Sequence, residues 1–238
     1  MARPNVQKSN NASREKLRTL AAAGVFSALA YICCVLFHFK ASFLSFDLKD
    51  SVMAIGAMFF GPACGFAMSL LVSTIELVTI SSTGIYGYIM NLLSSIVFVC
   101  VGSFVYSRKR DMTGALVGML LSVVSVVAVM LGANLVITPY YMHVSVEDVR
   151  SMLLPLLLPF NLTKAVFNAS LVFLLYKPVS TALKASGFIG GVSGVARSAE
   201  MNGGRRSMTM LVVPTAVIVC VLALLFFFLY LQGSLEIG

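Results

Sequence analysis

Residues 51–80 read SVMAIGAMFFGPACGFAMSLLVSTIELVTI, and this stretch decides the topology of the chain. As one helix its 30 residues would be about 45 Å long, which is too long for an ordinary membrane span and too short for two full ones. Gly61 and Pro62 lie near its first third. Because proline removes a backbone donor and disfavours a helix interior, we expect a break there, between a short membrane helix and a longer one.

The composition is that of an integral membrane protein. Of the 238 residues, 59% are hydrophobic and 11% are charged, against about 45–50% and 25% in soluble domains. Further apolar runs, each fitting about one span, lie at residues 20–39, 85–107, 112–146, 151–176 and 207–232. We therefore predict an all-α integral membrane protein, with a six-helix bundle followed by an additional C-terminal transmembrane helix.

The charge distribution predicts the orientation. With the 51–80 run split in two, the basic residues before the first span and residues 108–110 fall on the same side, together with most of the 17 Lys and Arg. The positive-inside rule makes that side cytoplasmic, so the N-terminus is expected inside. The net charge of +8 then reflects orientation and attraction to the lipid membrane, and we expect no nucleic-acid binding.

Four segments follow from these runs. Residues 1–16 form a polar N-terminal tail, of which the first 13 look disordered. Residues 17–183 form the six-helix membrane domain, residues 184–207 a basic and flexible linker rich in Gly and Ser, and residues 208–232 the seventh helix. This last helix contains no ionisable side chain, which favours a structural role.

Lys164 is the most informative single residue. It lies in an otherwise almost wholly apolar stretch, where an ammonium costs about 2.5–3.5 kcal/mol and persists only if it faces protein, water or a ligand. Asn161 and Asn168 lie three residues before it and four after it, which places all three side chains on one helix face. This polar stripe is expected to face inward, toward a polar small molecule.

Two other polar residues in apolar runs are candidates. Glu76 could be a ligand contact, a counter-charge for Lys164, or a side chain that reaches water at a span end, and the sequence does not choose among these. Asn134 could lie at the depth of Asn161 and Lys164, or tie helices together by hydrogen bonds.

Small residues in the first span predict a helix-docking surface. Gly24 and Ala28 are four residues apart, as are Ala23 and Ser27. Such adjacent stripes allow another helix to approach closely in lipid.

Catalysis and metal binding have no credible constellation in the sequence. It contains no Walker phosphate-binding loop, so the chain is not itself an ATPase. The GVSG letters at residues 191–194, which match an intramembrane serine protease site, fall in the linker. The five Cys lie in apolar runs without zinc spacing. We expect no enzyme activity, no bound metal and no covalent cofactor.

Five segments in order resemble the riboflavin-specific substrate-binding (S) components of energy-coupling factor (ECF) transporters. They are FDLKD at 46–50, FFGP at 59–62, GIYGYIMN at 84–91, ANLVITP at 133–139 and LPFNLTK at 158–164. The resemblance covers residues 17–183 and implies six helices around a vitamin pocket near the outer face of a prokaryotic cell membrane.

The resemblance also implies residue roles. It assigns flavin contacts to Asn134, Asn161 and Lys164, and the two outer segments that complete the pocket would contribute Phe46, Leu48, Lys49, Ser82, Thr83, Gly84 and Tyr86, with Glu76 added as a candidate. The small residues Ala23, Gly24, Ser27 and Ala28 would dock on a transmembrane coupling subunit that works with two ATPase subunits.

Two alternatives remain open. The chain could be an S component for another vitamin or cofactor. It could also be a membrane assembly protein without a ligand, in which Lys164 merely pairs with Glu76.

Overall fold

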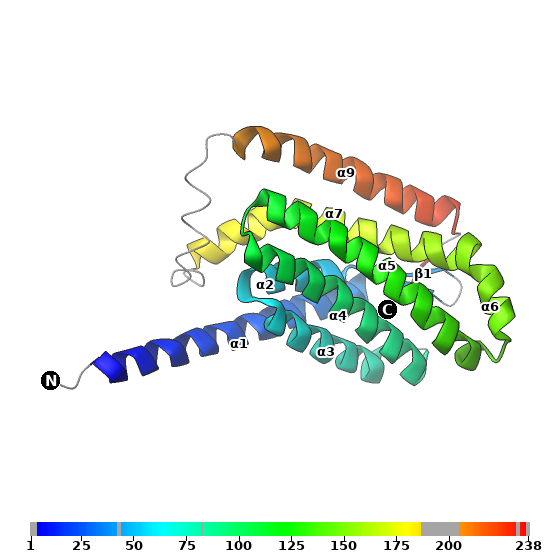
Figure 1. Cartoon of the computed structure of the whole chain (residues 1–238), viewed down its shortest axis with the longest axis horizontal. Helices are drawn as coiled ribbons and strands as arrows, with labels where there is room; N and C mark the ends of the chain where they lie inside the picture. Colours follow the sequence, from blue (N-terminus) through cyan, green and yellow to red (C-terminus); the bar gives the residue numbers. More distant parts are fainter. Residues whose placement is uncertain (1–3, 42–43, 82, 187–204, 232–233, 237–238) are drawn as a thin grey trace.

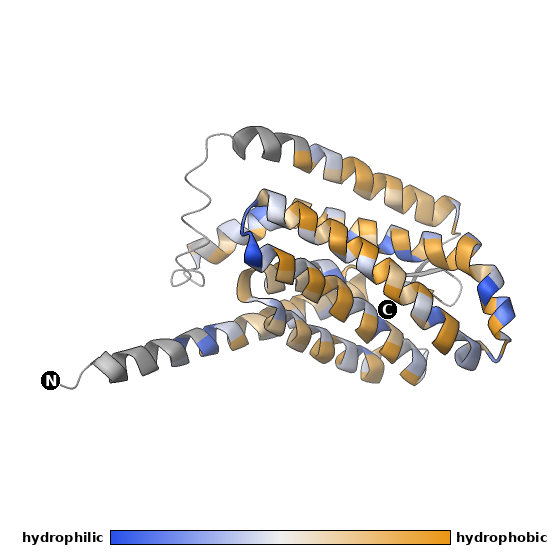
Figure 2. Ribbon diagram, in the orientation of Figure 1, coloured by the Kyte–Doolittle hydropathy of each residue, from blue (hydrophilic) through white to orange (hydrophobic). Residues whose placement is uncertain are grey.

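A computed structural model describes the chain except residues 1–3, 42–43, 82, 187–204, 232–233 and 237–238. Among the described residues, six helices are long and apolar enough to cross a membrane. Hydrophobic residues cover the outer sides of the helices, whereas hydrophilic residues gather at the two ends of the bundle (Figure 2). The all-α membrane fold predicted from the sequence is confirmed.

The 51–80 run breaks where the sequence predicts. Helix α2 (Lys49–Phe60) ends before Gly61, and α3 (Pro62–Thr79) begins with Pro62 in its first turn. Gly61 adopts a φ of 98°, a conformation that only glycine reaches without strain. Gly61 and Pro62 thus form the turn that divides one overlong apolar run into two helices of different length.

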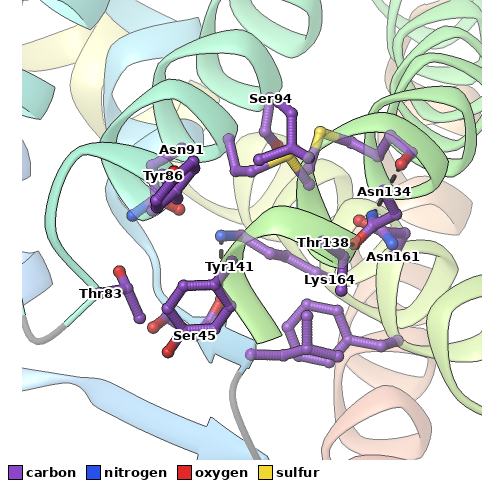
Figure 3. A pocket seen from close by; sticks show the side chains of 16 residues that line it. Ser45, Thr83, Tyr86, Asn91, Ser94, Asn134, Thr138, Tyr141, Asn161 and Lys164 are labelled. Atoms are coloured by element: carbon purple, nitrogen blue, oxygen red, sulfur yellow. Dashed lines mark hydrogen bonds between the residues drawn. The ribbon is translucent and has the colours of Figure 1, made fainter. Parts of the chain in front are cut away.

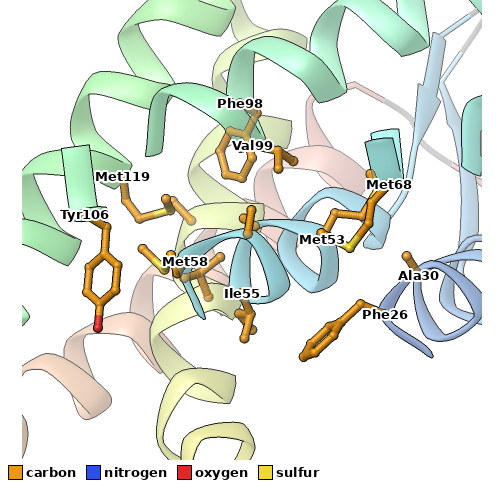
Figure 4. Packing of buried hydrophobic residues seen from close by; sticks show 14 of the residues in the cluster. Phe26, Ala30, Met53, Ile55, Met58, Met68, Phe98, Val99, Tyr106 and Met119 are labelled. Carbon is orange, nitrogen blue, oxygen red and sulfur yellow. The ribbon is translucent and has the colours of Figure 1, made fainter. Parts of the chain in front are cut away.

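Helix α2 is the centre of the bundle. Ten of its 12 residues are buried, and Figure 4 shows Met53, Ile55 and Met58 surrounded by side chains from the neighbouring helices. The surrounding side chains are Phe26 and Ala30 of α1 (Pro4–Leu36), Met68 of α3, Phe98, Val99 and Tyr106 of α4 (Gly84–Arg108), and Met119 of α5 (Met112–Met142). Methionine suits this position because its flexible thioether fills irregular gaps.

Helices α4 and α5 cross closely through glycine. A Cβ placed on Gly118 of α5 would lie 2.8 Å from the backbone oxygen of Gly102 in α4. Neither position has room for a side chain, so the two backbones approach as small residues allow in membrane helix pairs. This crossing fixes two of the helices that border the cavity described below.

One correction concerns the N-terminal part. Helix α1 begins at Pro4, so it includes residues that the sequence suggested were disordered. The outer segment after it, predicted to complete the pocket, forms the hairpin of β1 (His38–Ala41) and β2 (Leu44–Phe46). A third strand, β3 (Ser234–Glu236), pairs with β1 from the far end of the chain, giving the order β2-β1-β3.

The C-terminal half continues with α6 (Val146–Met152), a π-helical turn (Leu153–Leu157) and α7 (Leu158–Ala185). A capping box starts α6, since Ser145 and Asp148 bond reciprocally to each other's backbone N–H. Helix α9 (Arg205–Leu229) then lies along α7 (Figure 1). The predicted linker at 184–207 lies mostly outside the described residues.

Candidate functional site

A cavity of about 80 Å³ opens at the end of the bundle that carries the β1–β2 hairpin. This volume is smaller than the about 300–1,000 Å³ of most small-molecule sites, so a larger ligand requires the walls to move apart. Figure 3 shows its walls converging from α4, α5, α7 and the hairpin. They are formed by Leu44, Ser45, Thr83, Tyr86, Gly87, Met90, Asn91, Ser94, Met130, Asn134, Ile137, Thr138, Tyr141, Phe160, Asn161 and Lys164.

Three asparagines reach the cavity wall with fixed orientations. Asn161 donates through Nδ2 to the Leu157 carbonyl oxygen at 2.7 Å, and Asn134 donates in the same way to the Met130 carbonyl oxygen at 2.7 Å. Because a carbonyl oxygen can only accept, each Nδ2 must face its own helix. Within the described part of the chain the Asn161 Oδ1 is left available as an acceptor, while the Asn134 Oδ1 accepts from the Thr138 hydroxyl at 2.9 Å.

Asn91 is oriented by a carboxylate. Its Nδ2 donates to Glu76 Oε1 at 2.9 Å, and an ionised carboxylate has no proton to give. The Asn91 Oδ1 is therefore the amide atom not bound to Glu76, and no donor among the described residues occupies it. Although Glu76 does not line the cavity, it sets how Asn91 can hydrogen-bond there.

Lys164 lies between the cavity and the hairpin. Its ammonium donates to Asp47 Oδ2 at 3.0 Å and to the Ser45 carbonyl oxygen at 3.2 Å, and Figure 3 shows it reaching the hairpin beside the cavity. An ammonium has three hydrogens. Of the three, two are used by these contacts with described residues, which leaves one for a molecule in the cavity.

Four buried charges form a chain of ion pairs that starts at Lys164. Asp47 accepts from Lys164 and lies 3.8 Å from the Lys49 ammonium, which in turn forms a hydrogen-bonded ion pair with Glu76. Buried charges are tolerated when each is paired and hydrogen-bonded. The chain joins α7, the β2–α2 junction and α3, and it returns to the cavity through Asn91.

Asn168, the third member of the predicted polar stripe, serves the backbone at the same junction. Its Nδ2 donates to the Asp47 carbonyl oxygen at 3.0 Å, and its Oδ1 accepts from the Ser51 backbone N–H at 3.0 Å. Beside it, Asp50 accepts from the Ser95 hydroxyl at 2.5 Å. Asn168 therefore fixes the start of α2, and it does not line the cavity beside Lys164.

These contacts decide a question that the sequence left open. The counter-charge of Lys164 is Asp47 and not Glu76, whose carboxylate pairs with Lys49. Asp47, Lys49 and Asp50, in the outer segment after the first span, are 0%, 0% and 3% exposed. Pairing with partners distant in the sequence pulls these charged side chains into the bundle.

The sequence-predicted site residues divide into two groups. Thr83, Tyr86, Asn134, Asn161 and Lys164 line the cavity. The other described residues lie behind the wall: Phe46 and Leu48 pack in an aromatic cluster, Lys49 and Glu76 belong to the ion pairs, and Gly84 begins α4. Ser82 lies outside the described residues.

Several lining residues were not singled out from the sequence. Asn91 and Ser94 are polar residues three apart in the α4 span, the same signal that identified the stripe on α7. Thr138 lies four residues after Asn134. The apolar walls, which include Met90, Met130, Tyr141 and Phe160, carry no such signal because they resemble any other core residue.

The small residues of α1 lie on two faces of the helix, one exposed and one packed against the bundle. Gly24 and Ala28 are exposed, and a Cβ placed on Gly24 would meet nothing within 4 Å. Ser27 is buried and Ala23 is half-buried. Of the two predicted stripes, the one formed by Gly24 and Ala28 thus lies on the outer surface of the bundle.

Comparison with known proteins gives a family and a fold. Residues 18–176 match the family model described as ECF transporter, substrate-specific component. A solved structure of the S component of a bacterial ECF transporter superposes with a TM-score of 0.61 at 20% identity, covering 71% of this chain and 99% of that one. A comparison with curated protein sequences finds no match.

Proposed function

Because the chain belongs to the family of ECF transporter substrate-specific components, we propose that it binds riboflavin in the cavity beside Lys164. S components are substrate-binding subunits, not enzymes, and they work in a membrane with coupling and ATPase subunits. The observation that carries the riboflavin proposal is the set of amides and one ammonium on the wall of a cavity with aromatic and methionine sides.

The polar groups suit a flavin. The ring system of riboflavin has an edge with two carbonyl oxygens flanking an N–H, and its tail carries hydroxyl groups. The Asn91 and Asn161 Oδ1 atoms can accept from such donors, and the free hydrogen of Lys164 can bond a carbonyl oxygen. A ligand that met these groups without matching them would leave buried polar atoms unpaired, which costs affinity.

The apolar walls suit the flat ring. Tyr86, Tyr141 and Phe160 are aromatic, and Met90 and Met130 are thioethers. Aromatic side chains pack favourably against another ring, and methionine sulfur adapts to its edge. The cavity therefore offers surfaces of the kind that a planar heterocycle requires.

The Gly24 and Ala28 surface is our candidate for docking on the coupling subunit. It is exposed, lacks bulk and lies on the helix that the family resemblance assigned to this role. In this assignment, riboflavin enters from the outer face of a prokaryotic cell membrane and partner ATPases energise its uptake.

A direct experiment tests the ligand. Protein purified in mild detergent from cells supplied with riboflavin should be yellow with flavin absorbance, and calorimetric titration of the ligand-free form should show saturable riboflavin binding. Binding of a different vitamin from a panel, with none of riboflavin, would identify an S component of other specificity. No binding to any member of the panel would instead favour a membrane assembly role.

A further inference from the structure

Helix α9 and strand β3 lie beyond the part of the chain that matches the family. The family model ends at residue 176, whereas α9 covers Arg205–Leu229. Its contact with the bundle is a narrow stripe at a spacing of seven, four and four residues. The buried residues of that stripe are Ala216, Ala223 and Phe227 of the helix and Leu231, two residues past its end.

Phe227 connects α9 to the hairpin. It is 0% exposed, and its ring centroid lies 4.7 Å from that of Phe46, the last residue of β2. Phe46 also contacts Phe167 at 5.0 Å and Phe160 at 6.5 Å between centroids, both on α7. The end of β2 is therefore held between α7 and α9.

The held residue is adjacent to the cavity. Leu44 and Ser45, which precede Phe46, line it, and the Ser45 carbonyl oxygen accepts from Lys164. Phe160 lines it as well. A displacement of Phe46 would thus move a wall of the cavity and one of the two anchors of its cation.

A second contact reaches the other strand of the hairpin. Strand β3, which follows α9, pairs antiparallel with β1, with Phe39 opposite Leu235. In Figure 1, α9 runs along α7 and ends near β1. Both strands of the hairpin are consequently fixed by the C-terminal segment, β2 through a ring contact and β1 through backbone pairing.

We propose that α9 and β3 form a clamp that holds the β1–β2 hairpin against the cavity, with Phe227 as the positioning residue that sets how fast a bound ligand leaves. The clamp itself depends only on the contacts above, and its effect on ligand release rests on the proposed function. Because the hairpin forms one wall of the cavity, loosening the clamp removes contacts that hold a bound ligand, and it raises the dissociation rate more than the association rate.

The clamp is tested without a ligand by hydrogen exchange of the full chain in lipid nanodiscs. In the Phe227→Ala variant, amides of residues 38–41 and 44–46 should exchange about tenfold faster than in the wild type, while those of α2 keep their rates. Phe226→Ala is the matched control, because Phe226 is 38% exposed and stacks on Tyr230, the residue after the end of α9, at 4.8 Å between ring centroids. If Phe227→Ala does not fold, the milder Phe227→Leu should still raise the exchange rate of the hairpin amides above that of the wild type, by less than about tenfold.

The results separate the clamp from general stability and from the choice of ligand. Hairpin exchange at the wild-type rate in Phe227→Ala, or faster exchange spread evenly over the bundle, would overturn the clamp. With riboflavin bound, Phe227→Ala should raise the dissociation rate about tenfold and leave the association rate nearly unchanged, whereas Phe226→Ala changes neither. If wild-type protein binds no riboflavin, the proposed function fails while the exchange rates still decide the clamp.

Discussion

The Lys164 ammonium lies 3.0 Å from the Asp47 carboxylate, although the two residues are 117 positions apart in the chain. This pair joins α7 to the junction between β2 and α2, and it places a cation at the cavity wall without leaving it uncompensated. It therefore serves both the stability of the bundle and the chemistry of the site, and the two roles can be separated by substitution.

Replacing Lys164 by Met should weaken riboflavin binding by about 1.5–3 kcal/mol, since one partner of a charged hydrogen bond is lost. Calorimetric titration measures the change. Lys109→Met is the control, because Lys109 is an exposed cation paired with Asp111 in the turn between α4 and α5, and it should bind as the wild type does. An unchanged affinity in Lys164→Met would remove this residue from the site.

Replacing Asp47 by Asn should destabilise the protein before any ligand is added. Lys49 and Lys164 would each lose a buried counter-charge, and breaking a buried ion pair costs about 3–5 kcal/mol. Thermal unfolding in detergent should show a clear fall in Tm. Glu147→Gln, which breaks an exposed pair with Arg150, should leave Tm almost unchanged; equal shifts in the two variants would contradict this account of the buried pairs.

A methyl group at Gly118 should disturb the α4–α5 crossing. Its Cβ would lie 2.8 Å from the Gly102 backbone oxygen, and overpacking of this kind costs about 1–3 kcal/mol. Gly118→Ala should accordingly lower Tm. At Gly132, on the same helix, a Cβ meets nothing within 4 Å, so Gly132→Ala should be neutral or slightly stabilising, as expected for Gly→Ala in a helix.

A bulky side chain on the small-residue surface of α1 should impair docking and spare ligand binding. Gly24→Leu is expected to reduce co-purification with the coupling and ATPase subunits, because close helix approach in lipid requires small residues. Gly132→Leu is the matched control, since Gly132 is also exposed and has open space around it. Full co-purification of Gly24→Leu would place the docking surface elsewhere.

Part of this fold could be predicted from the sequence because it depends on local properties. The break at Gly61–Pro62 follows from backbone chemistry, and the inward direction of Lys164 follows from the cost of a charge in lipid. The same reasoning applied to α4 would have added Asn91 to the site, since it too is a polar residue in an apolar span.

The rest depends on contacts between distant segments. Hydropathy does not predict the burial of Asp47 and Lys49, because it counts their charges and does not count their partners, Glu76 and Lys164. The contact between Phe46 and Phe227 cannot be predicted from the sequence either, because an aromatic residue in an apolar span can face lipid as well as protein.

The shortness of α2 has a consequence for how the protein is made. At 12 residues it is about 18 Å long, well below the roughly 30 Å of a bilayer core, and it carries Lys49 and Asp50 in its first turn. It cannot be retained as an independent span when it leaves the ribosome. We therefore expect this segment to become fixed in the bundle only when its neighbours α3, α4 and α7 are in place, and chains halted before α7 should remain open to proteases at residues 47–60.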